Sequence, residues 1–446
     1  MHFVFLNQFY PPDVLPTGVV LEAVAQELVA QGHVVTVVCA RSSVGSGGPS
    51  GKGGKRPAQG GPSVPPEVSP GAAGSVPPLT EGGSESLRVN EIQVSASPEV
   101  RIVRLRALGW GRKKSTMGKV LAYASYYAGV GWWILRQHHR ADVIVALTTP
   151  PYLSVLARAF SKVRGGRHAH WIMDLYPDVM VAHGMIREGS FALRMLRGLT
   201  RWGFGGRRCV AAVTLGPDMA EKVQAYLSPS RKASWVPLWG SATGQALPAE
   251  VAALRLARGW KPEEVVFLYS GNIGLGHRIL DCITAAQSSD LKDQPIRLAF
   301  YGGGKRLPEV EAALRAWASG SSTLGGYVER ELLAAHLATG DVHLASLDPA
   351  WDGTMLPSKL QGIFAAGRPV LFTGSRSGDV GRWILESGAG WVCTPGDVAA
   401  HAAAMQEAMA PDVRERMGMA AREFAGKWFD KQVNVRKIAD ILAEVP

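Results

Sequence analysis

The stretch DVHLASLDPAWDGTMLPSKLQGIFAAGRPVLFT, residues 341–373, decides the fold. Apolar residues alternate over 342–346, as they do in a strand, and residues 348–357 carry the breakers Pro, Asp and Gly that predict a loop. Apolar residues then recur at helical spacing over 358–367, where Gly ends the helix. Residues 370–372 form a second strand. Strand, loop, helix and strand make the repeat unit of an α/β domain.

The start of this helix is a candidate anion site. Pro357 suits the first turn of a helix and Ser358 suits its cap. The N–H groups of Ser358, Lys359 and Leu360 have no partner within the helix and lie at the positive end of its dipole. Lys359 adds a full charge and the Ser358 hydroxyl adds a donor, so the segment suits a diphosphate. An ordinary capped helix is the alternative, because serine caps are common.

Length and composition favour two or three folded domains, since the chain has 446 residues and 46% of them are hydrophobic. The four cysteines lie far apart, which favours buried thiols in a reducing cytosol over a metal site or a disulfide framework. They are Cys39, Cys209, Cys282 and Cys393. Residues 1–6 are too short for a signal peptide, and no apolar run reaches the ~18 residues of a spanning helix. We therefore expect a cytoplasmic protein.

The positive charge is clustered. The formal net charge is +11, and no Asp or Glu occurs between Glu99 and Asp142. Basic residues in that interval are Arg101, Arg104, Arg106, Arg112, Lys113, Lys114, Lys119, Arg136 and Arg140. A second acid-free stretch carries Arg194, Arg197, Arg201, Arg207 and Arg208. Such clusters attract an anionic surface, and nucleic acid and anionic lipid are both candidates.

The first half of the chain begins with a βαβ unit: a strand at 3–6, a helix at 20–28 and a strand at 34–39. The unit lacks a full G-x-G-x-x-G, so a dinucleotide fingerprint is not supported. Residues 43–86 are rich in Gly, Pro and Ser, and they cannot bury enough apolar surface to offset chain entropy. We interpret them as a disordered insertion in a surface loop.

Residues 120–140, VLAYASYYAGVGWWILRQHHR, combine aromatic and apolar residues with basic flanks. Aromatic rings at the headgroup level and Lys or Arg on phosphates are typical of an interfacial helix. A buried helix of the N-terminal domain is the alternative. Both interpretations hold together if one face packs on the domain and the other contacts a membrane.

The segment HAHWIMDLYPD, residues 168–178, reads as a strand that runs into a loop. The carboxyl end of a strand in an open α/β sheet faces the crevice where ligands bind, so Asp174 lies where chemistry can occur. A turn or helix cap is the alternative role for Asp174. Either His168 or His170 could approach an acceptor from the strand, although a satisfied core histidine is the plainer interpretation.

A second domain follows a hinge between about residues 228 and 244 and restarts the strand and helix alternation. Its strands end in loop motifs near residues 271, 303, 327 and 348. Strands joined by crossover helices form a parallel, doubly wound sheet, and their carboxyl ends converge on one edge.

Four motifs in this order resemble family 4 glycosyltransferases, and in particular the subgroup of colanic-acid, capsule and O-antigen assembly that includes fucosamine-transferase-like enzymes. They are NQFYPPD (7–13), HWIMDLYPD (170–178), LYSGNIG (268–274) and LPSKLQGIFAAGRPVLF (356–372). The resemblance implies the GT-B architecture, two Rossmann-like, doubly wound parallel-sheet α/β domains facing across a cleft. It implies an acceptor-binding domain over 1–230, a nucleotide-sugar domain over 236–424, and a C-terminal helix in 425–446 that crosses back to the first domain.

The resemblance also implies the site residues. Those expected at the donor nucleotide-sugar are Gly18, Gly271, Asn272, His277, Arg278, Gly303, Lys305, Tyr327, Val328, Asp352, Leu356, Pro357, Ser358 and Lys359. Lys359 and backbone donors at Ser358 and Asn272 would stabilise the departing diphosphate, and Val328 would meet a uracil base. Asp174 would orient or deprotonate the acceptor hydroxyl. We expect neither a cofactor nor a metal ion.

The sequence departs from the family pattern at several positions. The paired glutamates of the family fall at Thr354 and Gly362, so Asp352 is the candidate substitute for the loop carboxylate. Asn272 and His277 stand where Arg and Lys are common, and Arg278 or Lys305 is expected to compensate. The usual His-Asp pair is Met-Asp at 173–174, as in the close subgroup.

The function implied is retaining transfer of a sugar from a UDP-sugar to a polyprenyl-diphosphate-linked saccharide in cell-surface polysaccharide biosynthesis. The enzyme would lie on the cytoplasmic, anionic face of the inner membrane. Alternatives are a transferase to a soluble acceptor, a nucleotide-sugar epimerase, and a non-catalytic basic binding protein. Nucleic acid is not an expected partner, because no recognised nucleic-acid module appears.

Overall fold

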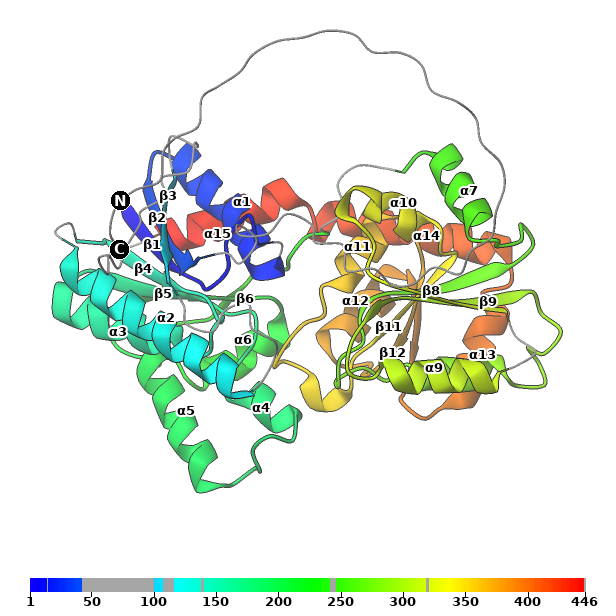
Figure 1. Cartoon of the computed structure of the whole chain (residues 1–446), viewed down its shortest axis with the longest axis horizontal. Helices are drawn as coiled ribbons and strands as arrows, with labels where there is room; N and C mark the ends of the chain where they lie inside the picture. The colour runs from blue at the N-terminus through cyan, green and yellow to red at the C-terminus, as the bar shows by residue number, and fades with distance from the viewer. Residues whose placement is uncertain are drawn as a thin grey trace, which may run out of the picture.

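The computed structural model describes residues 1–13, 15–41, 100–106, 116–137, 140–240, 246–317 and 321–444. The predicted insertion, residues 43–86, lies outside the described residues. Two parallel sheets with helices on both faces lie side by side (Figure 1). The prediction of two doubly wound, parallel-sheet domains is confirmed.

The N-terminal sheet has seven parallel strands in the order β3-β2-β1-β4-β5-β6-β7. Their bounds are β1 (His2–Leu6), β2 (Val34–Ala40), β3 (Val100–Leu105), β4 (Val143–Ala146), β5 (Arg167–Trp171), β6 (Cys209–Thr214) and β7 (Ser234–Trp235). Four of them, β1, β2, β4 and β6, are almost continuously apolar, because helices cover both faces of the sheet. Strand order reverses between β1 and β4, where open α/β sheets bind ligands.

Six helices surround this sheet. They are α1 (Pro16–Ala30), α2 (Thr116–Arg136), α3 (Leu153–Arg164), α4 (Asp178–Ala182), α5 (Phe191–Phe204) and α6 (Pro217–Gln224). Helix α2 packs one face on the domain, since Tyr126, Val130 and Trp133 are buried, whereas Leu121 and Leu135 are more than half exposed. Contact of the exposed face with a membrane stays a prediction. No helix among the described residues is both long and apolar enough to cross a membrane.

The C-terminal sheet has six parallel strands in the order β10-β9-β8-β11-β12-β13. Its strands are β8 (Val265–Asn272), β9 (Ile296–Gly303), β10 (Ser321–Gly325), β11 (Val342–Ser346), β12 (Val370–Thr373) and β13 (Gly390–Cys393). Its helices are α7 (Pro248–Ala257), α8 (Leu280–Ala286), α9 (Leu307–Ala316), α10 (Leu333–Ala338), α11 (Lys359–Ala365), α12 (Asp379–Ser387), α13 (Val398–Glu407) and α14 (Pro411–Trp428).

The stretch 341–373 forms β11, a loop, α11 and β12, as its pattern predicts. The cap prediction is wrong in one respect. Ser358 occupies the cap position, but its side chain makes no capping hydrogen bond. The reason is its backbone, with φ −76° and ψ 7°, since a capping side chain needs an extended cap residue to fold back onto the first turn.

Contacts between the two domains come from the C-terminal helix and from the loop before α11. The last helix, α15 (Lys431–Ala443), packs against α1 and β6 of the N-terminal domain. The Asn434 side chain in it donates to the carbonyl of Pro237 at 3.1 Å. Near the cleft, the Leu175 N–H donates to the Thr354 carbonyl at 2.8 Å. A single apolar cluster contains residues of both domains, so the two share a core.

A polar cluster of Asp218, Asp379 and Arg382, here called the latch, also joins the domains. The carboxylates of Asp218 and Asp379 each accept from the backbone N–H of the other, at 2.8 to 3.2 Å. Arg382 donates to both carboxylates, at 2.6 Å for Asp218 and 2.5 Å for Asp379. The first turns of α6 and α12 are therefore held face to face.

Candidate functional site

A cavity of about 200 Å³ opens at the carboxyl ends of β8 and β9, between α10 and the first turn of α11. Its wall includes Ser270, Gly271 and Gly302 from the strand ends and Ser358 and Lys359 from α11. Tyr301, Tyr327, Val328 and Gly362 also line it. These strand ends are the edge at which an open α/β sheet binds its ligand.

Two glycines make the floor of this cavity out of bare backbone. Gly271 has φ +127° and Gly302 has φ +128°, a backbone region that favours glycine. A Cβ on Gly302 would lie 2.2 Å from the Gly271 carbonyl oxygen, so no side chain fits between the neighbouring strands. Gly271 therefore pairs with Gly302 in the ladder with no side chain between them, and the Lys359 side chain lies over Gly271, with its Cε 2.8 Å from where a Cβ would stand.

Lys359 is the cation of the cavity. Its Nζ donates to the Tyr269 hydroxyl and to the Asn272 carbonyl at 3.1 Å, and it lies 4.2 Å from the centre of the Tyr269 ring. Burial lowers the pKa of Lys359 to about 7, because the charged form loses its water. A diphosphate beside Nζ would restore the charge on this amine.

His277 holds Lys359 in place. Its Nδ1 lies 2.6 Å from the carbonyl oxygen of Ser346, which can only accept, so Nδ1 carries the proton. Nε2 is then the acceptor, and it lies 3.4 Å from the Lys359 Nζ. Burial, and then the charge on Lys359, lower the pKa of His277 to about 4. The imidazole is therefore neutral, so its Nε2 can accept from Lys359 without placing a second positive charge beside the lysine.

Of the remaining residues predicted at the donor in this domain, Tyr327 and Val328 line the cavity, whereas Gly303, Arg278 and Lys305 lie outside its lining. Tyr327 is 69% exposed and lies over Gly303, where its ring would meet an added Cβ at 3.2 Å. Arg278 is half exposed and pairs with Asp348 at 3.7 Å. Lys305 is exposed and close enough to His183 of the N-terminal domain to lower the pKa of that histidine, after burial. Lys305 thus faces the space between the domains.

Several other residues predicted to bind the donor lie away from this cavity. Gly18 is in the first turn of α1, where a Cβ would come within 3.1–3.2 Å of the Phe9 and Tyr10 backbone. The backbone that closely approaches Gly18 is therefore that of the chain's own loop. The Asp352 carboxylate lies against Gly378, beside the Asp218–Asp379 latch, and Leu356 and Pro357 are buried in the loop before α11. Gly362, which stands at the position of the second family glutamate, lines the cavity.

Asp174 follows β5, in the loop that leads into α4, and it lies against the loop that precedes α11. Its backbone forms an isolated antiparallel bridge with Met355. The side chain lines a cavity of about 20 Å³ together with Thr148, Tyr152 and Tyr176. Burial raises the pKa of Asp174 to about 6. A carboxyl group with this pKa can exchange a proton near neutral pH.

Two residues of the site, Tyr269 and Ser346, were not predicted from the sequence. Tyr269 lies within the LYSGNIG motif, and alternation along β8 was the available signal for its inward direction. Ser346 ends β11 beside the other strand ends. His168 and His170 were possible acceptor contacts, whereas the structure buries both histidines within the N-terminal domain.

Comparisons with known proteins assign this architecture. Residues 264–410, which contain the cavity, match the family model described as Glycosyl transferases group 1. This region is a group 1 glycosyltransferase domain. The chain is 26% identical over 306 residues to the probable glycosyltransferase WbjE of Pseudomonas aeruginosa, with 67% of this chain and 74% of that protein covered.

A second relative is the putative colanic acid biosynthesis glycosyl transferase WcaI of Escherichia coli K12. It is 24% identical over 332 residues, which cover 73% of this chain and 80% of WcaI. The predicted family and enzyme class are thereby confirmed, and the chain is related to enzymes of polysaccharide biosynthesis.

Solved structures show the same fold. WaaG, a glycosyltransferase involved in lipopolysaccharide biosynthesis, matches with a TM-score of 0.64 and 16% identity, with all of both chains covered. Anabaena Alr3699/HepE in complex with UDP-glucose matches with a TM-score of 0.65 and 12% identity, again over all of both chains. The predicted GT-B fold class is confirmed.

Proposed function

We propose that this glycosyltransferase transfers a sugar from a UDP-sugar to a polyprenyl-diphosphate-linked saccharide with retention at the anomeric carbon. The observation that carries the proposal is the buried Lys359 Nζ beside the bare strand ends of β8 and β9. The likeness in fold to a structure with bound UDP-glucose supports the donor class. The relationship to a colanic acid transferase and the likeness to WaaG support a lipid-linked saccharide acceptor.

Departure of UDP from the sugar leaves new negative charge on the β-phosphate. Lys359, held by Tyr269 and His277, would meet this charge from one side of the cavity. The backbone N–H groups at the start of α11, where Lys359 itself stands, would add further donors to the same charge. Fixed donors aimed at a developing charge are a large part of catalysis in such sites. Asp174 would orient or deprotonate the acceptor hydroxyl.

A donor screen tests the proposal. Purified enzyme is incubated with UDP-, ADP- and GDP-sugars and with polyprenyl-diphosphate saccharides, and the linkage of the product is determined by NMR. We expect product from a UDP-sugar with the anomeric configuration of the donor, and its loss in Lys359→Ala. Product from ADP- or GDP-sugars only, or an inverted product, would contradict it. Equal turnover with water-soluble saccharides would favour the alternative of a soluble acceptor.

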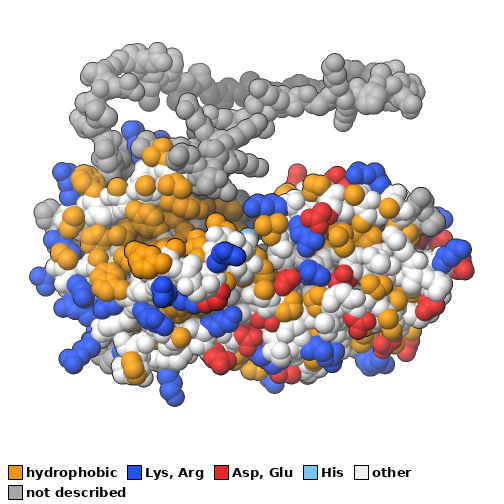
Figure 2. All heavy atoms as spheres, turned by 90° about the horizontal axis from the view of Figure 1, so that it is seen from below, with side chains coloured by type: hydrophobic (Ala, Val, Ile, Leu, Met, Phe, Trp, Pro, Cys, Tyr) orange, Lys and Arg blue, Asp and Glu red, His pale blue; other side chains and the backbone are white. Residues whose placement is uncertain are grey.

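We also propose that helix α5 places the enzyme on an anionic membrane. Phe191, Met195, Leu199 and Trp202 recur at helical spacing on α5, and all four are exposed, Phe191 by 69%. Arg194 and Arg201 are exposed on the same helix. Figure 2 shows hydrophobic side chains interspersed with Lys and Arg over the N-terminal domain, at the left of the view. This composition suits a bilayer interface.

Helix α2 extends the surface with exposed Val120, Leu121 and Leu135. Flotation with vesicles that contain anionic phospholipid tests this part. The double variant Phe191→Glu with Met195→Glu should lose binding, whereas Leu256→Glu, on the exposed face of α7 in the other domain, should keep it. Wild-type binding should weaken as salt increases. Binding that ignores salt, or equal loss in the control, would refute the assignment of α5.

A further inference from the structure

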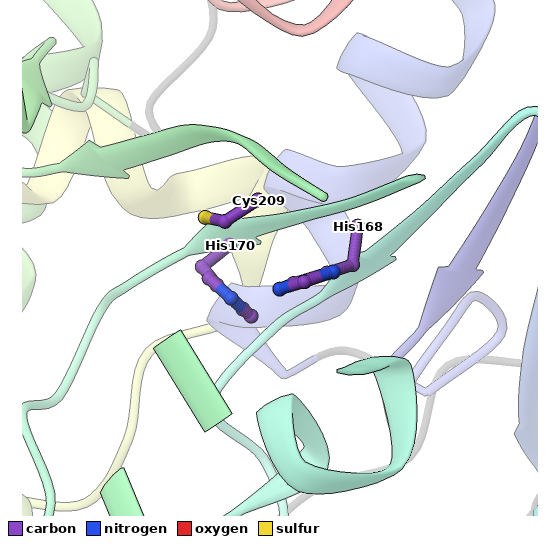
Figure 3. Close-up of side chains that lie close together, drawn as sticks. All are labelled: His168, His170 and Cys209. Carbon is purple, nitrogen blue, oxygen red and sulfur yellow. The ribbon is translucent and has the colours of Figure 1, made fainter. Parts of the chain in front are cut away.

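The N-terminal sheet contains a cluster of metal-ligating side chains that the transfer reaction does not use. His168 and His170 project from one face of β5, and Cys209 begins the neighbouring strand β6 (Figure 3). Their ligand atoms all lie within 4.8 Å of one another. The three residues are at most 2% exposed. Among the described residues, this is the one group of His, Cys, Asp or Glu with such an arrangement.

Hydrogen bonds determine which nitrogen of His168 is free. The Ser161 hydroxyl donates its proton to the Arg158 carbonyl at 2.8 Å. Ser161 Oγ must then accept from His168 Nδ1, which lies 3.0 Å away. His168 Nδ1 therefore carries the ring proton, and Nε2 presents a bare lone pair. That Nε2 is buried and has no hydrogen-bond partner. A ligating histidine oriented by a bond at its other nitrogen has this arrangement.

His170 lacks even the one hydrogen bond that His168 makes. Both of its ring nitrogens are buried without a hydrogen-bond partner, while the ring stacks on Phe204 at 4.7 Å. A buried polar atom without a partner loses its hydrogen bonds to water and gains none in return, so apolar residues would serve a plain core better. The carbonyls of Gly203 and Gly205 lie near the two rings but outside hydrogen-bonding geometry. Burial lowers the pKa of both histidines, so the rings are neutral, as metal ligands must be.

We propose that His168 Nε2, one nitrogen of His170 and Cys209 Sγ bind a single thiophilic metal ion, Cu⁺ or Zn²⁺. Thiolate and imidazole ligands select these ions over Mg²⁺ or Ca²⁺. On binding, the Cys209 thiol releases one proton to solvent and the Sγ–metal bond replaces the S–H bond. Bonds of about 2.0–2.3 Å place three trigonal ligand atoms roughly 3.5–4 Å apart, so small side-chain rotations close the site.

Charge balance favours the monovalent ion. Arg158 and Arg208 act on His168 with their positive charge, and Arg231 acts on Cys209. A thiolate with two neutral imidazoles makes a neutral complex with Cu⁺ and a complex of charge +1 with Zn²⁺. A buried net charge beside three guanidinium groups is unfavourable. The ion would tie β5 to β6 below Asp174, since His170 also lines the small cavity that contains Asp174.

Metal content of the full chain tests the site. Because the site is closed, protein is expressed in medium supplemented with copper or zinc, purified under reducing and anaerobic conditions, and analysed by elemental mass spectrometry. We expect about one ion per chain, copper in preference to zinc, and loss of at least tenfold in Cys209→Ser and His170→Asn. Cys282→Ser, which alters a buried cysteine of the other domain, is the matched control and should keep the ion.

X-ray absorption of the wild-type protein tests the site even if a variant fails to fold, because it should show one sulfur and two nitrogen neighbours. Zinc bound through these three residues would support the site and reject the charge argument for Cu⁺. Less than about a tenth of an ion per chain from either medium, or full occupancy in Cys209→Ser, would overturn the proposal. UDP binding by the same preparations is measured separately, so failure of the metal site and failure of the donor site are distinguishable.

Discussion

The ionisation of Lys359 makes a quantitative prediction for UDP binding. Burial lowers the pKa of this amine to about 7 in the free protein. A bound diphosphate favours the charged amine and raises the pKa again. The affinity for UDP is therefore highest below pH 7. It falls as the pH rises from about 7 toward the higher pKa that Lys359 has in the complex.

The magnitude follows from the protonated fraction of free Lys359. About half of the molecules carry the proton at pH 7 and roughly a tenth at pH 8, so binding should take up about 0.5 proton at pH 7 and about 0.9 at pH 8. Above pH 7.5 the affinity should fall by up to about tenfold per unit, or about 1.4 kcal/mol. This range avoids the second phosphate ionisation near 6.

Calorimetric titration with UDP between pH 7 and 9, in buffers of different ionisation enthalpy, measures both quantities. Lys359→Arg is the matched control, because guanidinium stays charged at every pH in this range. The control should lose the pH slope while it retains measurable binding. A wild-type affinity that is constant from pH 7 to 9, or an equal slope in Lys359→Arg, would refute the assignment of the slope to Lys359.

Three further predictions follow from other parts of the structure. Asp174→Asn should lower kcat by about 10²–10⁴ while UDP affinity is unchanged. Wild-type activity should fall as the pH drops below about 6, because the Asp174 carboxylate is then protonated. Steady-state kinetics over pH 5–8 checks both. Gly302→Ala should destabilise the C-terminal domain by at least about 1 kcal/mol, since it combines φ +128° with a clash against the Gly271 carbonyl, which a lower denaturant midpoint would show. Tyr126→Phe should cost about 1 kcal/mol, because the buried hydroxyl donates to the Val38 carbonyl at 2.8 Å; an unchanged midpoint would contradict this.

Much of the fold was predictable because its signals are local. Alternation over 342–346, breakers in the following loop and helical spacing from Lys359 onward are properties of short segments. The order of such segments indicates parallel sheets. The failure of Ser358 to cap α11 was not predictable, since it depends on the ψ angle that the preceding loop imposes on that residue.

The site was predictable only in part, since its remaining contacts join distant segments. Asp352 lies in the expected loop, but its carboxylate lies against Gly378 and near Asp218 of the other domain, and both are distant from it in the sequence. The spacing of the cysteines argued against a metal site, whereas the register of β5 against β6 brings Cys209 to His168 across about forty residues of chain. The apolar residues at helical spacing on α5 were a local signal of an exposed apolar face. The sequence-based prediction of an anionic partner used only the arginines of that helix.

Nucleotide selectivity at Lys359 tests the central claim most directly. Calorimetric titration of the wild-type chain and of Lys359→Ala with UDP, ADP and GDP at pH 7 is the measurement. We predict binding of UDP in preference to ADP and GDP, and an affinity for UDP about tenfold or more lower in the variant, as expected for loss of a charge-assisted hydrogen bond. A preference for ADP or GDP would contradict the donor class. Wild-type UDP affinity in Lys359→Ala would contradict the site itself.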